Sequence, residues 1–263
     1  MELDGRPVTP DELGALGLYN YGHFTSMRVE EDGRVRGLSL HLDRLRHDCQ
    51  ALHGVDLDLE LVRRLARRAV ATVTLPRIVR VTVFDPTLDL AHPGADAHPR
   101  ILVSTRPAST GALPPLKLRS VHYERELPEV KHVGLFGTMR HRRAAQLDGY
   151  DDVVFADAKS RISEGATWNV AFLRDGKVLW PQSDWLPGVT MRLVTEVMER
   201  NGIEFETVEV TLHEIGMMEA AFITNAAIGV RPIRSIDGVD FTADLPAIDL
   251  LQREYMAIPG DTL

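Results

Sequence analysis

The chain has 263 residues, 44% of them hydrophobic and 26% charged, which is enough to bury one large core or two cores of ordinary size. Its net charge of -8 argues against a nucleic-acid-binding surface, which needs clustered Lys and Arg. The single cysteine, Cys49, excludes an internal disulfide and a cysteine-based zinc site, and no apolar run approaches the roughly 20 residues that span a bilayer. We therefore expect a cytoplasmic protein without a metal site that binds neither membrane nor nucleic acid.

The first half of the chain alternates between strand-like and helical patterns. The sequence FTSMRV at 24–29 predicts a strand that ends at the turn sequence EEDGR. A helix is predicted over 39–54, where apolar side chains recur at spacings of three and four: Leu42, Leu45, Cys49 and Leu52. A second helical pattern follows at 61–73. After Pro76, the alternation in RIVRVTVF and the later RILVST predict two strands.

Residues 106–115, RPASTGALPP, are too rich in Pro, Gly and small side chains for a helix or strand, so they are interpreted as a linker. This divides the chain into domains at 1–105 and 116–263. The second half predicts strands at LRSVHY, DDVVFAD, NVAFLRDGKVLW, FETVEV and AAFITN, and helices after Lys131 and at GVTMRLVTEVMERNG. Mixed strands and separate helices favour an α+β fold.

Four features of the second half suggest chemistry, although each alone has an ordinary structural explanation. Lys131 stands at an element boundary, where most lysines are solvated. Glu164 lies 33 residues further on, in RISEGATWNV. The sequence LPGVT opens a helix, whose free N–H groups and positive dipole end suit a phosphate. The strand FITN ends in Thr224 and Asn225.

In this order and spacing, the four features resemble the class IV, fold-type IV pyridoxal-phosphate enzymes, from about Tyr21 to Gly238. That family includes branched-chain and D-amino-acid aminotransferases and aminodeoxychorismate lyases. The resemblance implies a two-domain homodimer that binds pyridoxal 5'-phosphate, with Lys131 as the Schiff-base lysine that also moves the substrate proton. Glu164 would hold the proton on the pyridine nitrogen.

The resemblance also assigns the remaining cofactor-binding residues. The helix sequence HLDRL matches an early family helix whose arginine holds the phosphate, which is Arg44 here; the alternative is a solvated helix face. Further phosphate or frame positions are Thr167, Asn169, Val189, Thr190, Thr224 and Asn225. The cationic sequence RHRR at 140–143 is interpreted as the solvent face of a helix.

Substrate contacts are expected on one face of the FTSMRV strand, where Phe24, Ser26 and Arg28 alternate with Thr25 and Met27. Tyr21 matches a pocket tyrosine of the branched-chain enzymes, and Trp168 either closes the pocket or packs in the core. The sequence departs from both aminotransferase subfamilies. Gly134 and Leu135 replace an Asn-Tyr pair, and no arginine stands at the carboxylate clamp of the D-amino-acid enzymes.

The expected reaction is amino transfer from an amino acid or primary amine, including D-amino acids and (R)-amines, to a 2-oxo acid. The alternative is an aminodeoxychorismate lyase that releases pyruvate and 4-aminobenzoate. Ser26 stands where those lyases carry a threonine hydroxyl, and several local matches favour them, whereas SEGATWNV and LPGVTMRLV look more like aminotransferases. A non-catalytic binding protein is a third interpretation, and the intact Lys131 and Glu164 argue against it.

Overall fold

The computed structural model describes residues 1–263, which form two compact units. Unit 1 contains Met1–Ser109, Val130–Gly134 and Pro259–Leu263, and unit 2 contains Thr110–Glu129 and Leu135–Ile258. None of the helices combines the length and apolar character that a membrane crossing requires.

This division differs from the predicted domains at 1–105 and 116–263, because two short segments of the second half, 130–134 and 259–263, group with unit 1. Both segments join unit 1 through backbone hydrogen bonds to its strands, which apolar patterning cannot reveal. The last strand before the boundary also runs to Pro107, two residues into the predicted linker.

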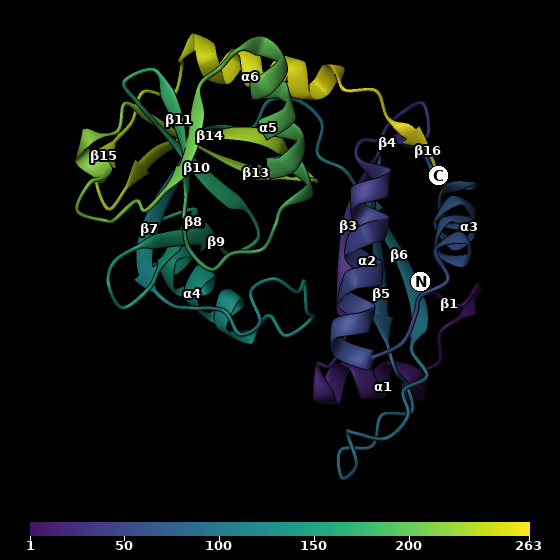
Figure 1. Ribbon diagram of the computed structural model, residues 1–263. Coiled ribbons are helices and arrows are strands. Elements are labelled where there is room, and N and C mark those ends of the chain that lie inside the picture. Colours follow the sequence, from purple (N-terminus) through teal and green to yellow (C-terminus); the bar gives the residue numbers. More distant parts are fainter. The chain divides into compact units, whose positions relative to one another are not determined.

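Unit 1 is built on one antiparallel sheet with the strand order β16-β4-β3-β5-β6-β1-β2 (Figure 1). The three long strands coincide with the predicted ones. The bounds are β1 (Glu2–Leu3), β2 (Arg6–Pro7), β3 (His23–Val29), β4 (Arg34–Val35), β5 (Arg77–Phe84), β6 (Arg100–Pro107) and β16 (Asp261–Thr262).

Helices α2 (Leu38–His53) and α3 (Leu59–Val70) cover one face of this sheet, α2 on β3 and α3 on β5 and β6. Alternate strand residues such as Met27 and Val81 enter this core and are fully buried, as is Leu45 of α2. The predicted alternation in β3 is therefore confirmed. The other residues of the strands point to the opposite face of the sheet.

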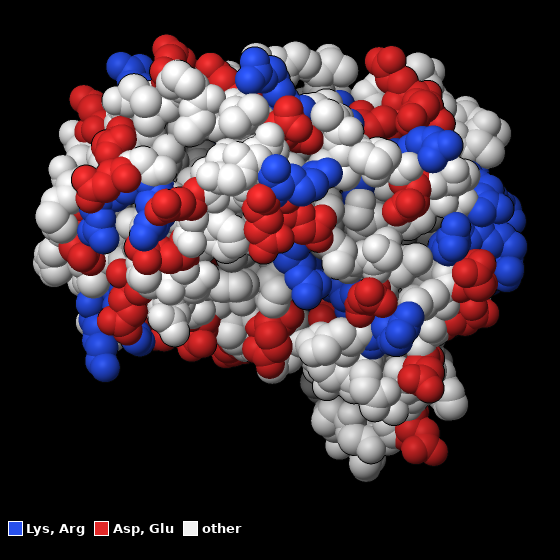
Figure 2. Space-filling model, turned by 45° about the horizontal axis from the view of Figure 1, so that its top comes forward, with Lys and Arg blue, Asp and Glu red and all other residues white.

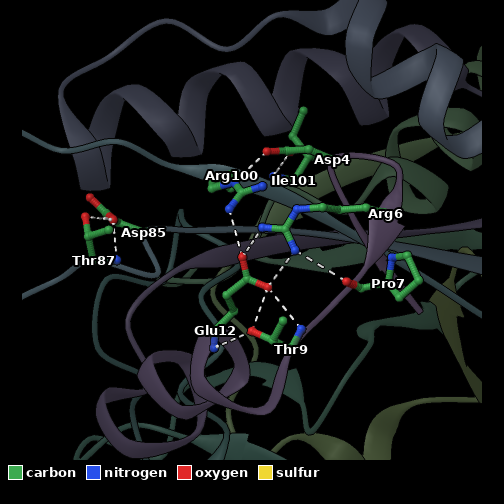
Figure 3. Close-up of polar contacts among 9 residues, drawn as sticks. All are labelled: Asp4, Arg6, Pro7, Thr9, Glu12, Asp85, Thr87, Arg100 and Ile101. Carbon is green, nitrogen blue, oxygen red and sulfur yellow. Dashed lines mark hydrogen bonds and ion pairs between the residues drawn. The ribbon is translucent and has the colours of Figure 1, made fainter.

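The first helix, α1 (Pro10–Tyr19), was not predicted, although its start signal is present in the sequence. Thr9 accepts a hydrogen bond from the Glu12 amide and the Glu12 carboxylate accepts one from the Thr9 amide, which forms a capping box. Figure 3 shows that the same carboxylate also contacts Arg6 and Arg100. The hydrogen bond from Arg6 is the largest of the causes that lower the pKa of Glu12 to about 2.

Unit 2 is organised around a closed barrel. Six strands follow one another in the order β10-β13-β14-β7-β8-β9, and β9 pairs again with β10 to close the ring. Strands β11 and β12 extend the sheet from β10, and β15 pairs with β14. The bounds are β7 (Leu116–His122), β8 (Asp152–Ala156), β9 (Ile162–Gly165), β10 (Asn169–Arg174), β11 (Lys177–Pro181), β12 (Phe205–Val208), β13 (Ala220–Asn225), β14 (Gly229–Ile236) and β15 (Val239–Asp240).

The strands of the barrel surround one apolar cluster that includes Leu118, Val170 and Ile233. Trp168 belongs to this cluster, is 4% exposed and donates its indole N–H to Asp152 Oδ2 at 3.0 Å. Its ring occupies the space that a side chain at Gly165 would need. The expected pocket role of Trp168 is therefore corrected to a core role, which was the alternative.

Unit 2 contains three α-helices: α4 (Phe136–Leu147), α5 (Val189–Asn201) and α6 (Pro246–Ala257), with a short 3-10 helix, η1 (Ile215–Met217). The first two match predicted helices, whereas α6 was not predicted. Helix α5 packs against α6 and β13, as Figure 1 shows. The side chains of α5 that face these elements, including Val194 and Val197, are fully buried.

The prediction that RHRR is a solvent face holds for only half of it. Arg140 and Arg143 are exposed, but His141 packs on Tyr123 and Arg142 pairs with the buried carboxylate of Asp152 at 3.4 Å. These contacts attach α4 to the barrel wall. Over most of the face drawn in Figure 2, acidic and basic side chains are interspersed, with uncharged atoms between them.

Candidate active site

Lys131 lies in the segment 130–134, which continues the sheet of unit 1 at one end of β3. The Phe24 amide donates to Lys131 O at 2.9 Å, and the Val133 amide donates to Gly22 O at 2.9 Å. A bridge between His23 and His132 completes this pairing. The backbone that follows the Cα atom of Lys131 is therefore held by strand-like hydrogen bonds.

Helix α2 presents three polar side chains on one face, at helical spacings of three and four: His41, Arg44 and Asp48. Asp48 Oδ2 accepts the Lys131 amide proton at 3.0 Å. His41 is buried and pairs with Thr25 Oγ1 at 2.7 Å. Burial, assisted by the charges of Arg44 and Lys131, lowers the pKa of His41 to about 3, so its imidazole is neutral near pH 7. Two cations thus share a region with a neutral histidine and a buried carboxylate.

The ring of Phe24 lies between two cations on the face of the sheet opposite α2. Arg80 Cζ is 3.6 Å from the ring centroid and Lys131 Nζ is 5.0 Å from it. Arg80 stands opposite Ser26 in the strand register and donates from Nε to Thr82 Oγ1 at 3.2 Å. No acidic side chain pairs with Arg80, and burial lowers its pKa. A partly buried guanidinium without an acidic partner is suited to bind an anion.

Two other predicted substrate residues are engaged with the protein itself. Tyr21 is 41% exposed and donates its hydroxyl proton to Leu52 O at 2.7 Å. Arg28 pairs with Glu30 at 3.0 Å and donates to Ser109 O at 2.9 Å, so its guanidinium is engaged within the protein, with a carboxylate that it shares with Arg36. Among the arginines on this face, Arg80 is therefore better suited than Arg28 to hold a substrate anion.

In unit 2, the barrel register brings three of the predicted residues into one row. Asn169 of β10 pairs with Glu164 of β9 on one side and with Thr224 of β13 on the other. All three are buried, with exposed fractions of 6% or less. Glu164 and Thr224 thus flank Asn169 on its two sides, because β9 and β13 both pair with β10.

The Glu164 carboxylate is held by two partners that sequence reasoning missed. Arg125 donates from Nε to Oε1 at 3.0 Å, and the Leu186 amide donates to Oε2 at 3.1 Å. Both side chains of the ion pair are largely buried. An ionised carboxylate fixed in this way is suited to hold a proton on a ring nitrogen.

Asn169 links this row to the start of α5. Its Nδ2 donates to Leu186 O at 2.8 Å, and its Oδ1 occupies the space that a side chain at position 188 would need. Gly188 is consequently the residue that lets the loop approach the barrel before α5 begins. Asn169 therefore serves as a frame residue.

The start of α5 carries the features that favour a bound anion. The first helical hydrogen bond runs from the Arg192 amide to Gly188 O, so the amides of Val189 and Thr190 have no partner within the helix. The hydroxyls of Thr190 and Thr224 are both buried and have no hydrogen-bond partner. An anion bound at this helix start would supply the acceptor that both hydroxyls lack.

Asn225, in contrast, uses its side chain within the turn between β13 and β14. Its Oδ1 accepts the amides of Ala227 and Ile228, each at 3.0 Å. Its Nδ2 lies 3.5 Å from Thr167 O, so the structure brings these two predicted residues together. The Thr167 side chain is exposed. The Asn225 amide therefore orders the turn that follows Thr224.

The profile of the family described as "Amino-transferase class IV" matches residues 22–236. The chain belongs to the class IV aminotransferase family. Class IV aminotransferases use pyridoxal phosphate as their cofactor. A "Probable branched-chain-amino-acid aminotransferase" of Rickettsia typhi is 31% identical over 44% of this chain and 42% of its own length. The chain thus spans about two fifths of this curated relative.

Two solved structures show that the fold is shared well beyond that stretch. A branched-chain aminotransferase from Thermoproteus uzoniensis superposes with a TM-score of 0.85 at 20% identity, covering 97% of this chain and 92% of its own. A putative 4-amino-4-deoxychorismate lyase from Legionella pneumophila gives a TM-score of 0.81 at 19% identity, covering 93% of both chains. The predicted fold-type IV architecture is confirmed.

The residues present fit pyridoxal phosphate. The phosphate needs hydrogen-bond donors, and the unpartnered hydroxyls of Thr190 and Thr224 stand with the free amides at the start of α5. The pyridine nitrogen needs an ionised carboxylate, and Glu164 is fixed by Arg125. The aldehyde needs a lysine, and Lys131 has an anchored backbone.

Proposed function

We propose that this protein is a pyridoxal-phosphate-dependent aminotransferase that moves an amino group from an amino acid or primary amine to a 2-oxo acid. The main support is the pair of buried, unpartnered hydroxyls beside the start of α5, in a chain that also supplies Lys131 and Glu164. Two further statements stay predictions from the resemblance: that the donor is a D-amino acid or an (R)-amine, and that the protein is a homodimer.

In this proposal the chain divides the cofactor's groups among its own residues. Thr190, Thr224 and the amide of Val189 donate to the phosphate, and Arg44 adds a positive charge for it. Glu164 would hold the proton on the ring nitrogen, with Arg125 as the residue that orients its carboxylate. When bound, pyridoxal phosphate accepts the amino group and withdraws electrons from the substrate's reacting carbon.

Lys131 does two jobs. With pyridoxal phosphate bound, Lys131 would be the residue that holds the cofactor through its aldehyde carbon and gives way to an incoming amino group. Once released, the Lys131 amine would carry the proton that leaves the substrate carbon. Because strand-like hydrogen bonds fix the Lys131 backbone, only its side chain has to move between these positions.

Arg80 is assigned the substrate carboxylate in this proposal, the role that the sequence left without a residue. It stacks on the same phenylalanine ring that Lys131 Nζ approaches, and it has no acidic partner of its own. Ser26 and Ser104, its neighbours in the strand register, are small enough to leave space above it.

We expect Arg80→Gln to lower kcat/KM for an amino acid about 100-fold, the loss of a charge-assisted hydrogen bond. The half-reaction with the matching amine, which lacks the carboxylate, should change only a few-fold. Stopped-flow absorbance with each donor measures both rates. Arg77→Gln, the same change on β5 at a residue that bonds to Thr74 O, is the control. Equal losses for both donors would show that Arg80 does not hold the carboxylate.

The experiment that tests the function is absorbance spectroscopy of the purified protein loaded with pyridoxal phosphate. Each of a panel of D- and L-amino acids, (R)-amines and aminodeoxychorismate is added alone. A productive donor should shift the band near ~410 nm to one near ~330 nm, and a 2-oxo acid should restore it. No shift with any donor would contradict amino transfer.

The second candidate is the aminodeoxychorismate lyase, which the likeness to the Legionella pneumophila structure and the hydroxyl of Ser26 favour. In that case Ser26 assists release of pyruvate as an acid-base group. The two functions therefore predict different results for loss of a single hydroxyl.

If the protein is an aminotransferase, Ser26→Ala should change the rate with a small donor only a few-fold, because Lys131 carries the proton. Ser26→Val should fill the space beside Arg80 and slow bulky donors most. For a lyase, Ser26→Ala should cost about 10²-fold or more. We expect the aminotransferase pattern. Pyruvate release from aminodeoxychorismate by the wild type that collapses in Ser26→Ala would favour the lyase.

A further inference from the structure

A buried carboxylate, Asp48, lies behind Lys131 and has no role in the proposed function. It is fully buried on α2, four residues after Arg44. Placing a carboxylate in a protein interior is costly unless hydrogen bonds and opposite charges compensate for it. The hydrogen bonds and charges around Asp48 therefore indicate its role.

Both oxygens of Asp48 have partners. Oδ2 accepts the Lys131 amide at 3.0 Å, and Oδ1 lies 3.0 Å from Nδ1 of His47, whose side chain is exposed. The positive charge of Arg44 also acts on this carboxyl. The charged and titratable groups that act on Asp48 are His47 and Arg44, which belong to the same helix. The segment packed against this helix contacts Asp48 through the amide of Lys131.

We propose that Asp48 is a positioning residue: it fastens the backbone of Lys131 to α2 and places a negative charge on the α2 side of the segment that carries the Lys131 amine. This inference rests on the proposed function. Burial raises the pKa of Asp48, whereas the bonds from His47 and Lys131 and the charge of Arg44 oppose that shift. The net shift is upward, and the hydrogen bonds and the charge of Arg44 act toward the ionised form that the role requires.

A negative charge at this position stabilises the protonated form of the link between Lys131 and the cofactor. Removing the charge should make that link lose its proton at lower pH. The backbone contact is measured by hydrogen exchange. The Lys131 amide, which donates to the Asp48 carboxylate, exchanges its proton with solvent only when that hydrogen bond breaks. The two roles can be measured separately.

Asp48→Asn keeps the size and one acceptor oxygen but removes the charge. In the loaded protein, we expect the pH titration of the lysine-bound cofactor band to shift downward by about one unit. The thermal midpoint is measured beside it, because loss of the charge also removes the compensation of Arg44 and His47 and lowers stability by itself. A merely structural Asp48 would change the midpoint and leave the titration in place, and that result would overturn the charge role.

Asp48→Ala removes the acceptor. In the cofactor-free protein, hydrogen exchange at the Lys131 amide should accelerate at least about 10-fold. Unchanged exchange at that amide would overturn the anchoring role. Asp43→Asn makes the same chemical change as Asp48→Asn at an exposed position of α2 and should alter neither readout. If the wild type forms no lysine-bound band, the proposed function fails, while the exchange experiment still decides whether Asp48 anchors Lys131.

Discussion

We expect Lys131→Ala to abolish amino transfer and to leave bound pyridoxal phosphate unable to link covalently to the protein. The physical reason is that no other lysine has comparable surroundings. The remaining three lysines are Lys117, which stacks on Tyr150, Lys159, which is exposed, and Lys177, which lies near Glu204 and Glu206. Borohydride treatment of the loaded protein followed by peptide mass spectrometry measures the link.

In the wild type, the reduced adduct should be found on the peptide that contains Lys131. Lys159→Ala is the matched control, because it removes an exposed lysine and should keep both the adduct and the activity. A reducible adduct that persists in Lys131→Ala would show that another lysine binds the cofactor. Since the chain has only four lysines, the modified peptide would identify it.

Glu164→Gln should lower kcat by about 10³-fold while the cofactor still binds. The substitution keeps the side-chain size but removes the charge that holds the proton on the ring nitrogen. The phosphate-binding hydroxyls of Thr190 and Thr224 are not touched, so the cofactor dissociation constant should change much less than the rate. Single-turnover absorbance measures the rate of the chemical step, and equilibrium titration measures the cofactor dissociation constant.

The same substitution leaves Arg125 buried without its partner, which alone can destabilise a protein. A double variant, Arg125→Met with Glu164→Gln, removes the unpaired cation. If the rate loss arises from the missing carboxylate, the double variant should remain as slow as the single one. Recovery to a near-normal rate would show that the unpaired arginine, and not the ring-nitrogen contact, caused the loss.

Sequence reasoning located most elements because their patterns are local. The spacing from Leu42 to Leu52 predicted α2, and Gly54 ends that helix in the left-handed conformation at a φ of 68°. The alternation in β5 predicted a strand with its valines in the core. Helix α1 was missed even though Thr9, Pro10 and Glu12 form its start signal, because the signal precedes a weakly amphipathic run.

The candidate site was predicted less evenly. Lys131 and Glu164 were found through a resemblance of ordered motifs, and the structure adds the partners that hold them, Asp48 and Arg125. Arg80, to which we assign the substrate carboxylate as a proposal, could not be predicted because its position opposite Ser26 depends on the register between β3 and β5. Trp168 was placed in the pocket as one of two possibilities, and packing over Gly165 decided for the core.

The sequence by itself determined the α+β class, the long helices and strands, and the reactive residue types, because hydrophobic period and motif order are properties of neighbouring residues. Only the tertiary structure decided which residues meet: the row from Glu164 to Thr224 through the pairing of β9, β10 and β13, and the attachment of the Lys131 segment to β3 and α2. These contacts join residues far apart along the chain. Their hydrogen bonds run between backbone groups and buried polar atoms, which carry no periodic signal in the sequence.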